Sequence, residues 1–299
     1  MTAVAHRTNV TVTAIVVTHD SADVLCICLD ALKSAGVSII VVDNASTDNT
    51  ASIAEAYGVR VIAAPFNEGY GRANNRGIAA ANDAGWCLIV NPDLVVERDT
   101  VTRLQVIAER HAGAGMIVPV IIEHSGRIFD HDQTLLSPVS PPLPAAADSA
   151  DPTIHEVAFA SGACMLVRRE AFESVGGFDP EIFLFYEDDD LCQRLRQAGW
   201  RILKTNDVNV RHARGGSVAS KPGRQYHSRY HQAWSRCYVA SKHGVAAGLV
   251  PFLLAQGLKA LAAYATFNRR RIERHGGSMA GALAALRGRS AFENDPPGL

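Results

Sequence analysis

The chain has 299 residues, of which 47 % are hydrophobic and 20 % are charged, so it is long enough and apolar enough to fold around a core. Its formal net charge of −1 argues against a general nucleic-acid-binding protein, because such proteins are strongly basic. Residues 1–200 carry 13 basic and 26 acidic side chains, whereas residues 201–299 carry 16 and 4. The basic part is expected to meet an anionic partner (a nucleotide diphosphate, a membrane surface or nucleic acid) or the acidic part of the same fold.

The cysteines and the N-terminus predict a reducing, cytoplasmic location. None of the 6 cysteines belongs to a Cys-x-x-Cys motif, and most have apolar neighbours, so we expect them to be reduced and buried. The N-terminus holds one early arginine, Arg7, followed by polar residues and a short apolar run. This pattern is not typical of a signal peptide.

Four short apolar runs in the first part of the chain predict parallel strands. They cover residues 14–17, 39–42, 59–62 and 87–90. None of them alternates apolar with polar residues, and helical patterns lie between them, which indicates a parallel sheet covered on both faces. Ligands of such sheets bind at the carboxyl ends of the strands, so the residues after each run are the first candidates for a site.

The second half of the chain predicts shorter elements. Residues 137–152 are rich in proline and predict a loop. Beyond this loop the patterns predict a strand, a short helix, a longer helix that Gly199 stops, and two short strands. These expected elements cover residues 156–168, 169–175, 188–198, 202–203 and 208–210.

Residues 244–267 predict an amphipathic helix, and three arginines follow it at 269–271. An apolar face beside a basic cluster is typical of a helix that lies on an anionic membrane surface. The alternative is a helix packed on the core with a solvated basic end. The two expected faces are Leu254, Leu258, Leu261 and Ala265 on the apolar side, and Gln256, Lys259, Ala263 and Thr266 on the other.

Two polar segments are candidates for binding a nucleotide. Asp43 ends the second apolar run, and its carboxylate could accept hydrogen bonds from a base N–H or a ribose hydroxyl; the alternative is a turn in which Ser46 or Thr47 caps a helix. Residues 67–77 are rich in glycine and lead into an alanine-rich helix. The start of that helix, with Arg72 or Arg76, could hold a diphosphate, or the glycines could simply serve a turn with positive φ.

Three further features suggest metal binding and proton transfer. Asp93 follows an apolar strand, where a carboxylate could bind a hard divalent cation or merely start a helix. His212 could add a nitrogen ligand, which favours Mn²⁺ over Mg²⁺, although a lone histidine is more often structural. The four acids at 187–190 follow an aromatic run that raises carboxyl pKa values and suits one of them to act as a general base; the alternative is an acidic first turn of a helix.

Together these segments resemble the inverting glycosyltransferases of family 2, which have the GT-A fold, and in particular their rhamnosyltransferase-like branch. Each segment alone is weak, but their order and spacing between residues 14 and 217 are specific. The segments are Val17-Thr18-His19-Asp20-Ser21, Val42-Asp43-Asn44-Ala45-Ser46-Thr47-Asp48, Asn67-Glu68-Gly69-Tyr70-Gly71 with Asn75-Arg76-Gly77, Asn91-Pro92-Asp93, Ser161-Gly162-Ala163, Gly176-Gly177-Phe178-Asp179, Glu187-Asp188-Asp189-Asp190-Leu191 and His212.

The resemblance implies a role for each segment. Asp93 is the metal-binding acid of a DxD-type motif in which Asn91 replaces the first acid, and His212 is the other protein ligand of Mn²⁺ or Mg²⁺. Asp188 is the catalytic base, with Glu187 beside it. The acceptor side comprises Gly162, Ala163 and Asp190. The nucleotide-sugar site comprises Thr18, Asp20, Asp43, Asn44, Ser46, Gly69, Gly71, Arg72, Asn75, Asn91 and Asp93.

The expected reaction is a single displacement at the anomeric carbon. One carboxylate deprotonates the acceptor hydroxyl opposite the leaving group, and a divalent cation neutralises the departing diphosphate. The resemblance and the charge pattern together predict transfer of L-rhamnose from dTDP-rhamnose to a polyprenyl-diphosphate-linked saccharide or glycan in cell-envelope synthesis. Two alternatives are a UDP-sugar donor (galactofuranose, glucose or N-acetylglucosamine) and a catalytically idle, membrane-associated scaffold of the same fold.

The expected architecture is an α/β GT-A domain with a mostly parallel central sheet and helices on both faces, followed by a helical tail. The GT-A domain would cover residues 1–215, with a nucleotide-sugar half at 1–130 and an acceptor half at 153–215. The basic helical region would cover residues 216–299. Its predicted membrane attachment would make the protein peripheral on the inner face of the cell membrane.

Overall fold

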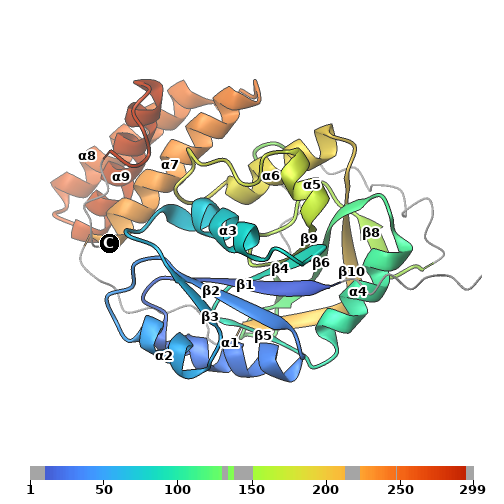
Figure 1. Ribbon diagram of the computed structural model, residues 1–299. Coiled ribbons are helices and arrows are strands. Elements are labelled where there is room, and N and C mark those ends of the chain that lie inside the picture. Colours follow the sequence, from blue (N-terminus) through green and yellow to red (C-terminus); the bar gives the residue numbers. More distant parts are fainter. Residues whose placement is uncertain (1–10, 130–133, 138–150, 213–222, 247, 294–299) are drawn as a thin grey trace, which may run out of the picture.

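The computed structural model describes residues 11–129, 134–137, 151–212, 223–246 and 248–293 (Figure 1). Its centre is a single 10-stranded mixed sheet. The strands are β1 (Val12–Thr18), β2 (Ser38–Asp43), β3 (Arg60–Ala63), β4 (Trp86–Val90), β5 (Leu94–Val96), β6 (Ala114–Ile122), β7 (Ile128–Phe129), β8 (Ile154–Glu156), β9 (Cys164–Arg168) and β10 (Arg201–His212).

The order of the main strands is β3-β2-β1-β4-β9-β6-β10-β5, and β7 and β8 are added beside β6 and β10. The pairs β1–β2, β2–β3, β1–β4 and β6–β10 are parallel, whereas β9 runs antiparallel to both β4 and β6. The four apolar runs of the first part of the chain therefore form the neighbouring parallel strands β3, β2, β1 and β4, as predicted. Their carboxyl ends lie along one edge of the sheet.

Helices cover both faces of the sheet (Figure 1). One face packs against α1, α2 and α4 and the other against α3, α5 and α6, which confirms the expected GT-A-like layering. All six cysteines are free, and all but Cys26 are buried. The helices are α1 (Ala22–Ser34), α2 (Thr50–Ala56), α3 (Gly69–Ala80), α4 (Thr100–Arg110), α5 (Arg169–Ser174), α6 (Glu187–Gln197), α7 (Arg224–Lys242), α8 (Leu249–Ala265) and α9 (Arg269–Leu286).

Three of the predicted strands were wrong in extent. Residues 156–168 form no single strand: β8 ends at Glu156 and β9 begins at Cys164. The chain leaves the sheet between them and brings Gly162 against α6. The two short strands expected at 202–203 and 208–210 are one strand, β10, which stays continuous because a shift in its pairing with β6, between Lys204 and Asn209, absorbs the polar residues there.

The C-terminal helices α7, α8 and α9 lie together at one end of the molecule (Figure 1). Among the described residues, no helix has the length and apolar character needed to cross a membrane. The proline-rich stretch 137–152 lies mostly outside the described residues, so its predicted loop cannot be compared. The domain boundaries given above remain predictions.

Candidate active site

The first part of the site forms where β1 and β2 end side by side. Their parallel register places Thr18 next to Asp43, and the Thr18 hydroxyl donates to Asp43 Oδ1 over 3.2 Å. Ser46 Oγ donates to the same oxygen at 2.5 Å, and the Ser46 backbone N–H donates to Asp43 Oδ2 at 3.3 Å. Asp43 is buried, so these hydroxyl and N–H donors hold its carboxylate in place. A carboxylate offers about four acceptor positions, which leaves capacity for a ligand donor.

Asp20 joins the same network from the loop after β1. It has a positive φ of 48°, which is uncommon for a residue other than glycine. Its backbone N–H donates to Ser46 Oγ at 3.0 Å, and its Oδ1 accepts the Thr47 N–H at 2.7 Å. The loops after β1 and β2 are therefore locked to each other.

Asn44 connects this network to the glycine-rich segment. Its side-chain amide donates to Asn67 Oδ1 at 2.9 Å and to the Gly69 carbonyl at 3.2 Å, and its Oδ1 accepts the Glu68 N–H at 2.9 Å. Thr18, Asp20, Asp43, Asn44 and Ser46 thus lie in one hydrogen-bonded group at the carboxyl edge. The structure brings together these five members of the predicted nucleotide-sugar site.

The two glycines of the segment permit close packing. Gly69 has φ +79°, and a Cβ there would overlap the Phe183 carbonyl oxygen. A Cβ on Gly71 would lie 3.0 Å from the Phe178 Cβ. The start of α3 therefore approaches the chain segment that leads to α6 more closely than any side chain would allow.

Arg72 and Asn75 face this same neighbouring segment. Arg72 Nε donates to the Pro180 carbonyl at 2.6 Å, and its guanidinium lies 3.8 Å from the centre of the Phe292 ring. Asn75 exchanges two hydrogen bonds, each of 2.9 Å, with the backbone of Phe178. Both side chains were predicted to belong to the nucleotide-sugar site. In the structure they instead contact the backbone of the segment before α6.

Asp93 and His212 meet as the resemblance implies. Asp93 lies in the loop between β4 and β5, His212 ends β10, and β10 pairs antiparallel with β5. His212 Nδ1 is 3.3 Å from Asp93 Oδ2, and the two side chains are 21 % and 37 % exposed. Hydrogen bonding to Asp93 raises the pKa of His212 against the opposing effect of burial, and the Asp93 charge adds to the rise.

This pair would suit a divalent cation. Ligand atoms about 2.1 Å from one cation and at right angles to each other lie roughly 3 Å apart, close to the spacing of the two side chains. Carboxylate oxygen and imidazole nitrogen together suit Mn²⁺. Within the described part of the chain, no group of three or more His, Cys, Asp or Glu side chains could hold a metal. A cation at Asp93 and His212 would take its other ligands from substrate or water.

Tyr70 links the Asn91-Pro92-Asp93 loop to the loop that contains Gly162. Its hydroxyl donates to the Gly162 carbonyl at 2.6 Å and lies 3.1 Å from Asn91 Oδ1. The Asn91 backbone N–H donates to the Ala163 carbonyl at 2.8 Å. Burial raises the pKa of Tyr70, so its hydroxyl keeps its proton. Although part of the quoted motif, Tyr70 had been given no role from the sequence.

Asp188 faces Gly162 from the first turn of α6. Its Oδ2 accepts the Gly162 N–H at 3.0 Å, and its Oδ1 accepts the Asp189 N–H at 2.9 Å. Phe185 and Tyr186, immediately before α6, have positive φ values of 69° and 66°, a conformation that costs bulky residues energy. Burial raises the pKa of Asp188, as expected for a carboxyl group that accepts a proton during catalysis.

Glu187 is buried beside Asp188, and its Oε2 has no hydrogen-bond partner. Burial, followed by the charge of Asp188, raises its pKa well above the ordinary value, which favours the protonated form of Glu187. When one of two neighbouring carboxyl groups stays protonated, the other can hold a negative charge without repulsion between two carboxylates. The pair Glu187 and Asp188 therefore has the electrostatics of a general-base site.

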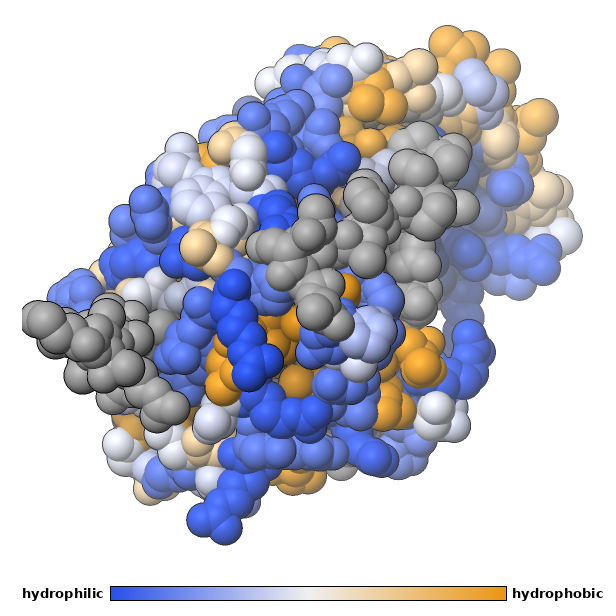
Figure 2. All heavy atoms as spheres, turned by 90° about the vertical axis from the view of Figure 1, so that its right-hand side faces the viewer, coloured by the Kyte–Doolittle hydropathy of each residue, from blue (hydrophilic) through white to orange (hydrophobic). Residues whose placement is uncertain are grey.

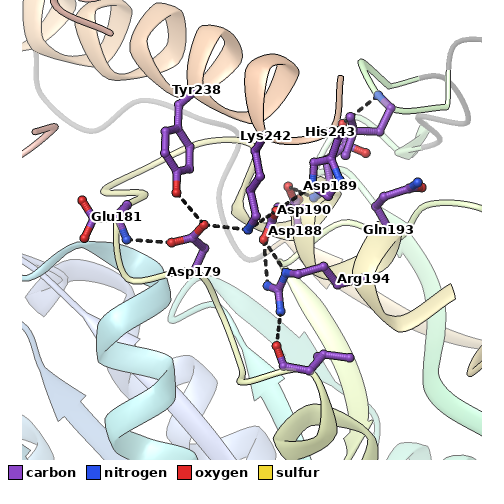
Figure 3. Close-up of polar contacts among 12 residues, drawn as sticks. Asp179, Glu181, Asp188, Asp189, Asp190, Gln193, Arg194, Tyr238, Lys242 and His243 are labelled. Atoms are coloured by element: carbon purple, nitrogen blue, oxygen red, sulfur yellow. Dashed lines mark hydrogen bonds and ion pairs between the residues drawn. The ribbon is translucent and has the colours of Figure 1, made fainter. Parts of the chain in front are cut away.

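The other two acids of the tetrad point elsewhere. Asp189 Oδ1 accepts the Thr134 hydroxyl at 2.7 Å. Asp190 is fully buried and lies within 2.6 Å of Lys242, 2.7 Å of Arg194 and 2.8 Å of His243 (Figure 3). Asp190 was expected to face the acceptor, but three basic side chains surround its carboxylate instead. Two of them, Lys242 and His243, are the last residue of α7 and the residue after it.

Lys242 also joins α7 to the segment before α6. Its Nζ is 2.6 Å from Asp179 Oδ2, to which the Tyr238 hydroxyl donates at 3.0 Å (Figure 3). The role of α7 was missed from the sequence, although the charge imbalance between the two parts of the chain was a signal for it. Lys242 of the basic part pairs with Asp179 and Asp190 of the acidic part, so some of the opposite charges neutralise each other within the fold.

Comparisons with known proteins identify the family. Residues 13–176 match the model of glycosyl transferase family 2. The chain is 32 % identical over 234 residues to the N-acetylglucosaminyl-diphospho-decaprenol L-rhamnosyltransferase of Mycobacterium tuberculosis, covering 69 % of this chain and 76 % of that protein. This likeness confirms the predicted resemblance to rhamnosyltransferases.

Solved structures show the same fold. The mannosyltransferase PcManGT from Pyrobaculum calidifontis, in complex with GDP-Man and Mn²⁺, matches 95 % of this chain and 88 % of its own with 18 % identity and a TM-score of 0.56. S. aureus TarS 1-349 in complex with UDP matches 96 % and 98 % with 14 % identity and a TM-score of 0.56, whereas this chain spans 39 % of a longer TarS structure. The chain therefore belongs to glycosyl transferase family 2 and has the GT-A fold.

Proposed function

We propose that this glycosyltransferase moves L-rhamnose from dTDP-rhamnose to a polyprenyl-diphosphate-linked saccharide, with inversion at the anomeric carbon and with the help of Mn²⁺ or Mg²⁺. The observation that carries the proposed chemistry is the short chain of contacts between the loop of Asp93 and the side chain of Asp188. The Asn91 side chain of that loop lies 3.1 Å from the Tyr70 hydroxyl, which donates to the Gly162 carbonyl, and the Gly162 N–H donates to Asp188. The loop of the donor-side acid and the first turn of α6, which carries the proposed base, are thereby held near each other, as a single displacement requires.

The group around Asp43 is proposed to bind the nucleoside. Asp43 and Asp20 supply carboxylate oxygens that can accept a base N–H and the sugar hydroxyl of the nucleoside, while Thr18, Ser46 and Thr47 fix their orientation. Hydrogen bonds among these residues hold the two carboxylates in fixed orientations, which lowers the entropic cost of binding. Asp93 and His212 would hold the divalent cation, which when bound neutralises charge on the leaving diphosphate.

Asp188 is proposed to take the proton from the acceptor hydroxyl. Two backbone N–H groups orient its carboxylate, and its raised pKa brings its basicity closer to that needed at neutral pH. The raised pKa of Glu187 favours a negative charge on Asp188 rather than on Glu187. The attacking oxygen then forms its bond to the anomeric carbon as the bond to the diphosphate breaks on the opposite side.

The choice of sugar and acceptor is supported by the Mycobacterium tuberculosis relative, whose name specifies an L-rhamnosyl group and an N-acetylglucosaminyl-diphospho-decaprenol. A lipid-linked acceptor of this kind would bring the protein to the inner face of the cell membrane. A UDP-sugar donor is the second candidate, because S. aureus TarS, which shares the fold, has been solved with UDP-GlcNAc.

The test is a panel of donors with a short-chain polyprenyl-diphosphate N-acetylglucosamine acceptor. We expect product from dTDP-rhamnose in the presence of Mn²⁺ or Mg²⁺, detected by mass spectrometry, with the anomeric configuration of the product inverted in its NMR spectrum. EDTA should abolish transfer, and added metal should restore it. Turnover of a UDP-sugar without turnover of dTDP-rhamnose would overturn the donor assignment, and full activity in EDTA would overturn the role of Asp93 and His212.

A further inference from the structure

Helix α8 presents a continuous apolar face to solvent. Val250, Leu254, Leu258 and Leu261 are 69 %, 64 %, 68 % and 68 % exposed. Their spacing of three or four residues places them on one side of the helix. Scattered single exposed apolar residues are normal, but a row of this kind marks an interaction surface.

The opposite side of α8 is already occupied. Ala260 and Ala263 are buried, and α8 packs on α9. His275 Nδ1 of α9 lies 2.8 Å from Gln256 Oε1 of α8. The structure thus fixes which side of α8 packs on the protein, and its main partner there is the neighbouring helix α9. Figure 1 shows α8 on the outer side of the C-terminal helices.

A basic cluster follows the apolar face directly. Phe267, in the turn after α8, is 92 % exposed, and Arg269, Arg270 and Arg271 are exposed at the start of α9. Arg269 pairs with Glu273 at 3.2 Å, and the sequence has no acidic residue between Asp207 and Glu273. By contrast, the near side of the molecule in Figure 2 is largely hydrophilic.

We propose that the α8 face, defined as Val250, Leu254, Leu258 and Leu261 together with Phe267 and the arginines at 269–271, docks on the surface of an anionic lipid bilayer. The leucines and Phe267 enter the boundary between headgroups and acyl chains, and the arginines contact anionic headgroups. The charge favours lipid over a second copy of this chain, because a second copy would bring another basic cluster to the same face. The inference rests on this face alone and holds whichever sugar the enzyme transfers.

Vesicle flotation with the full-length protein tests the proposal without donor or acceptor. Vesicles of phosphatidylcholine with about one third phosphatidylglycerol are compared with vesicles of phosphatidylcholine alone. We expect the parent protein to float with the anionic vesicles and to lose most of this binding at high salt, because salt screens the arginines. The triple variant Leu254→Gln, Leu258→Gln, Leu261→Gln should partition at least tenfold less.

A matched control removes exposed apolar side chains elsewhere. Ile27→Gln with Val106→Gln changes residues on α1 and α4 that are 50 % and 38 % exposed, and this double variant should bind vesicles like the parent. Circular dichroism and thermal unfolding show whether each variant is folded. Undiminished flotation of the folded triple variant overturns the proposal. The proposal is also overturned if the parent does not float and light scattering shows that the parent is a dimer while the triple variant is a monomer. Transfer to a water-soluble acceptor is measured separately, so failure of the docking face and failure of the proposed function are distinguishable.

Discussion

At the scale of single residues, the four consecutive acids at 187–190 have four different environments. Neighbouring residues of a helix point about 100° apart, so the four side chains necessarily diverge. Asp188 accepts backbone N–H groups, Asp189 accepts the Thr134 hydroxyl and Asp190 is surrounded by basic side chains, whereas Glu187 keeps one oxygen without a partner. This division supports the proposal that Asp188 accepts the proton.

Asp188→Asn should lower kcat by about 10³-fold, since general-base catalysis contributes roughly 10²–10⁴-fold. Asparagine keeps the size of the side chain but takes up no proton. The binding of the nucleotide donor, measured by calorimetry, should be little changed because Asp188 lies on the acceptor side of the proposed displacement. The control is Asp189→Asn on the same helix, which should change kcat less than tenfold. Equal losses in the two variants would indicate that the first turn of α6 matters only as structure.

Glu187→Gln should stabilise the protein at neutral pH. The folded protein holds the pKa of Glu187 well above its ordinary value of 4.5, mainly by burial, so the unfolded chain releases a proton that the folded chain keeps. Stability is therefore lost as the pH rises above the ordinary pKa, and glutamine removes that loss. Urea unfolding at pH 5 and pH 8 measures the effect. The gain over the parent should be larger at pH 8, and a gain that shrank as the pH rose would contradict a raised pKa of the buried Glu187 side chain.

At the scale of elements, the end of α7 holds the segment on either side of the proposed base. Lys242 contacts both Asp179 and Asp190, and the Ser235 hydroxyl donates to the Leu184 carbonyl at 2.9 Å. Burial alone would raise the pKa of Asp179, but hydrogen bonds from Lys242 and its other donors lower it overall. At pH values above the pKa that Asp179 has in the unfolded chain, its carboxylate therefore stabilises the folded protein. This contribution is lost as the pH falls and the carboxylate takes up a proton.

Lys242→Met should lower the free energy of unfolding by about 2 kcal/mol, because it leaves two largely buried carboxylates with fewer partners. Arg194 and His243 still contact Asp190, which limits the loss. Urea unfolding at pH 7 measures the change. Lys259→Met replaces an exposed lysine on α8 and should alter stability by less than about 0.5 kcal/mol. Indistinguishable stabilities of the two variants would mean that the ion pairs of Lys242 add nothing to the fold.

Much of the site at the carboxyl edge could be predicted, because apolar runs of parallel strands place the residues that follow them at one edge. Thr18 and Asp43 are neighbours for this reason. The meeting of Asp93 with His212 followed from resemblance, since 119 residues separate the two in the sequence. The contacts of Asp190 could not be predicted, because its partners lie on a distant helix. The role of Tyr70 depends on two loops whose approach no local pattern encodes.

At the scale of the whole molecule, the basic C-terminal helices divide their surfaces between the fold and solvent. Helix α7 faces the sheet domain: the Phe183 ring lies 4.3 Å from that of His231, and Trp234 is buried in the same cluster. Helix α8 faces outward. The opposite charges of the two parts of the chain therefore serve in part to hold α7 against the acidic segment around α6, as one of the two initial interpretations expected. The basic cluster at 269–271 belongs to the outward-facing part.

This division predicts that the sheet domain and α7 unfold together. Asp179, Phe183 and Asp190 each contact α7 while belonging to the segment that carries the proposed base, so separating α7 would expose buried charge and aromatic surface. We expect a single calorimetric transition whose calorimetric and van't Hoff enthalpies agree. In a Trp86→Phe, Trp200→Phe variant, fluorescence reports Trp234 of α7 alone and should change at the same urea concentration as the circular dichroism of the whole chain. An earlier fluorescence transition would instead make the C-terminal helices an independent unit, and the position of Asp188 would then not depend on α7.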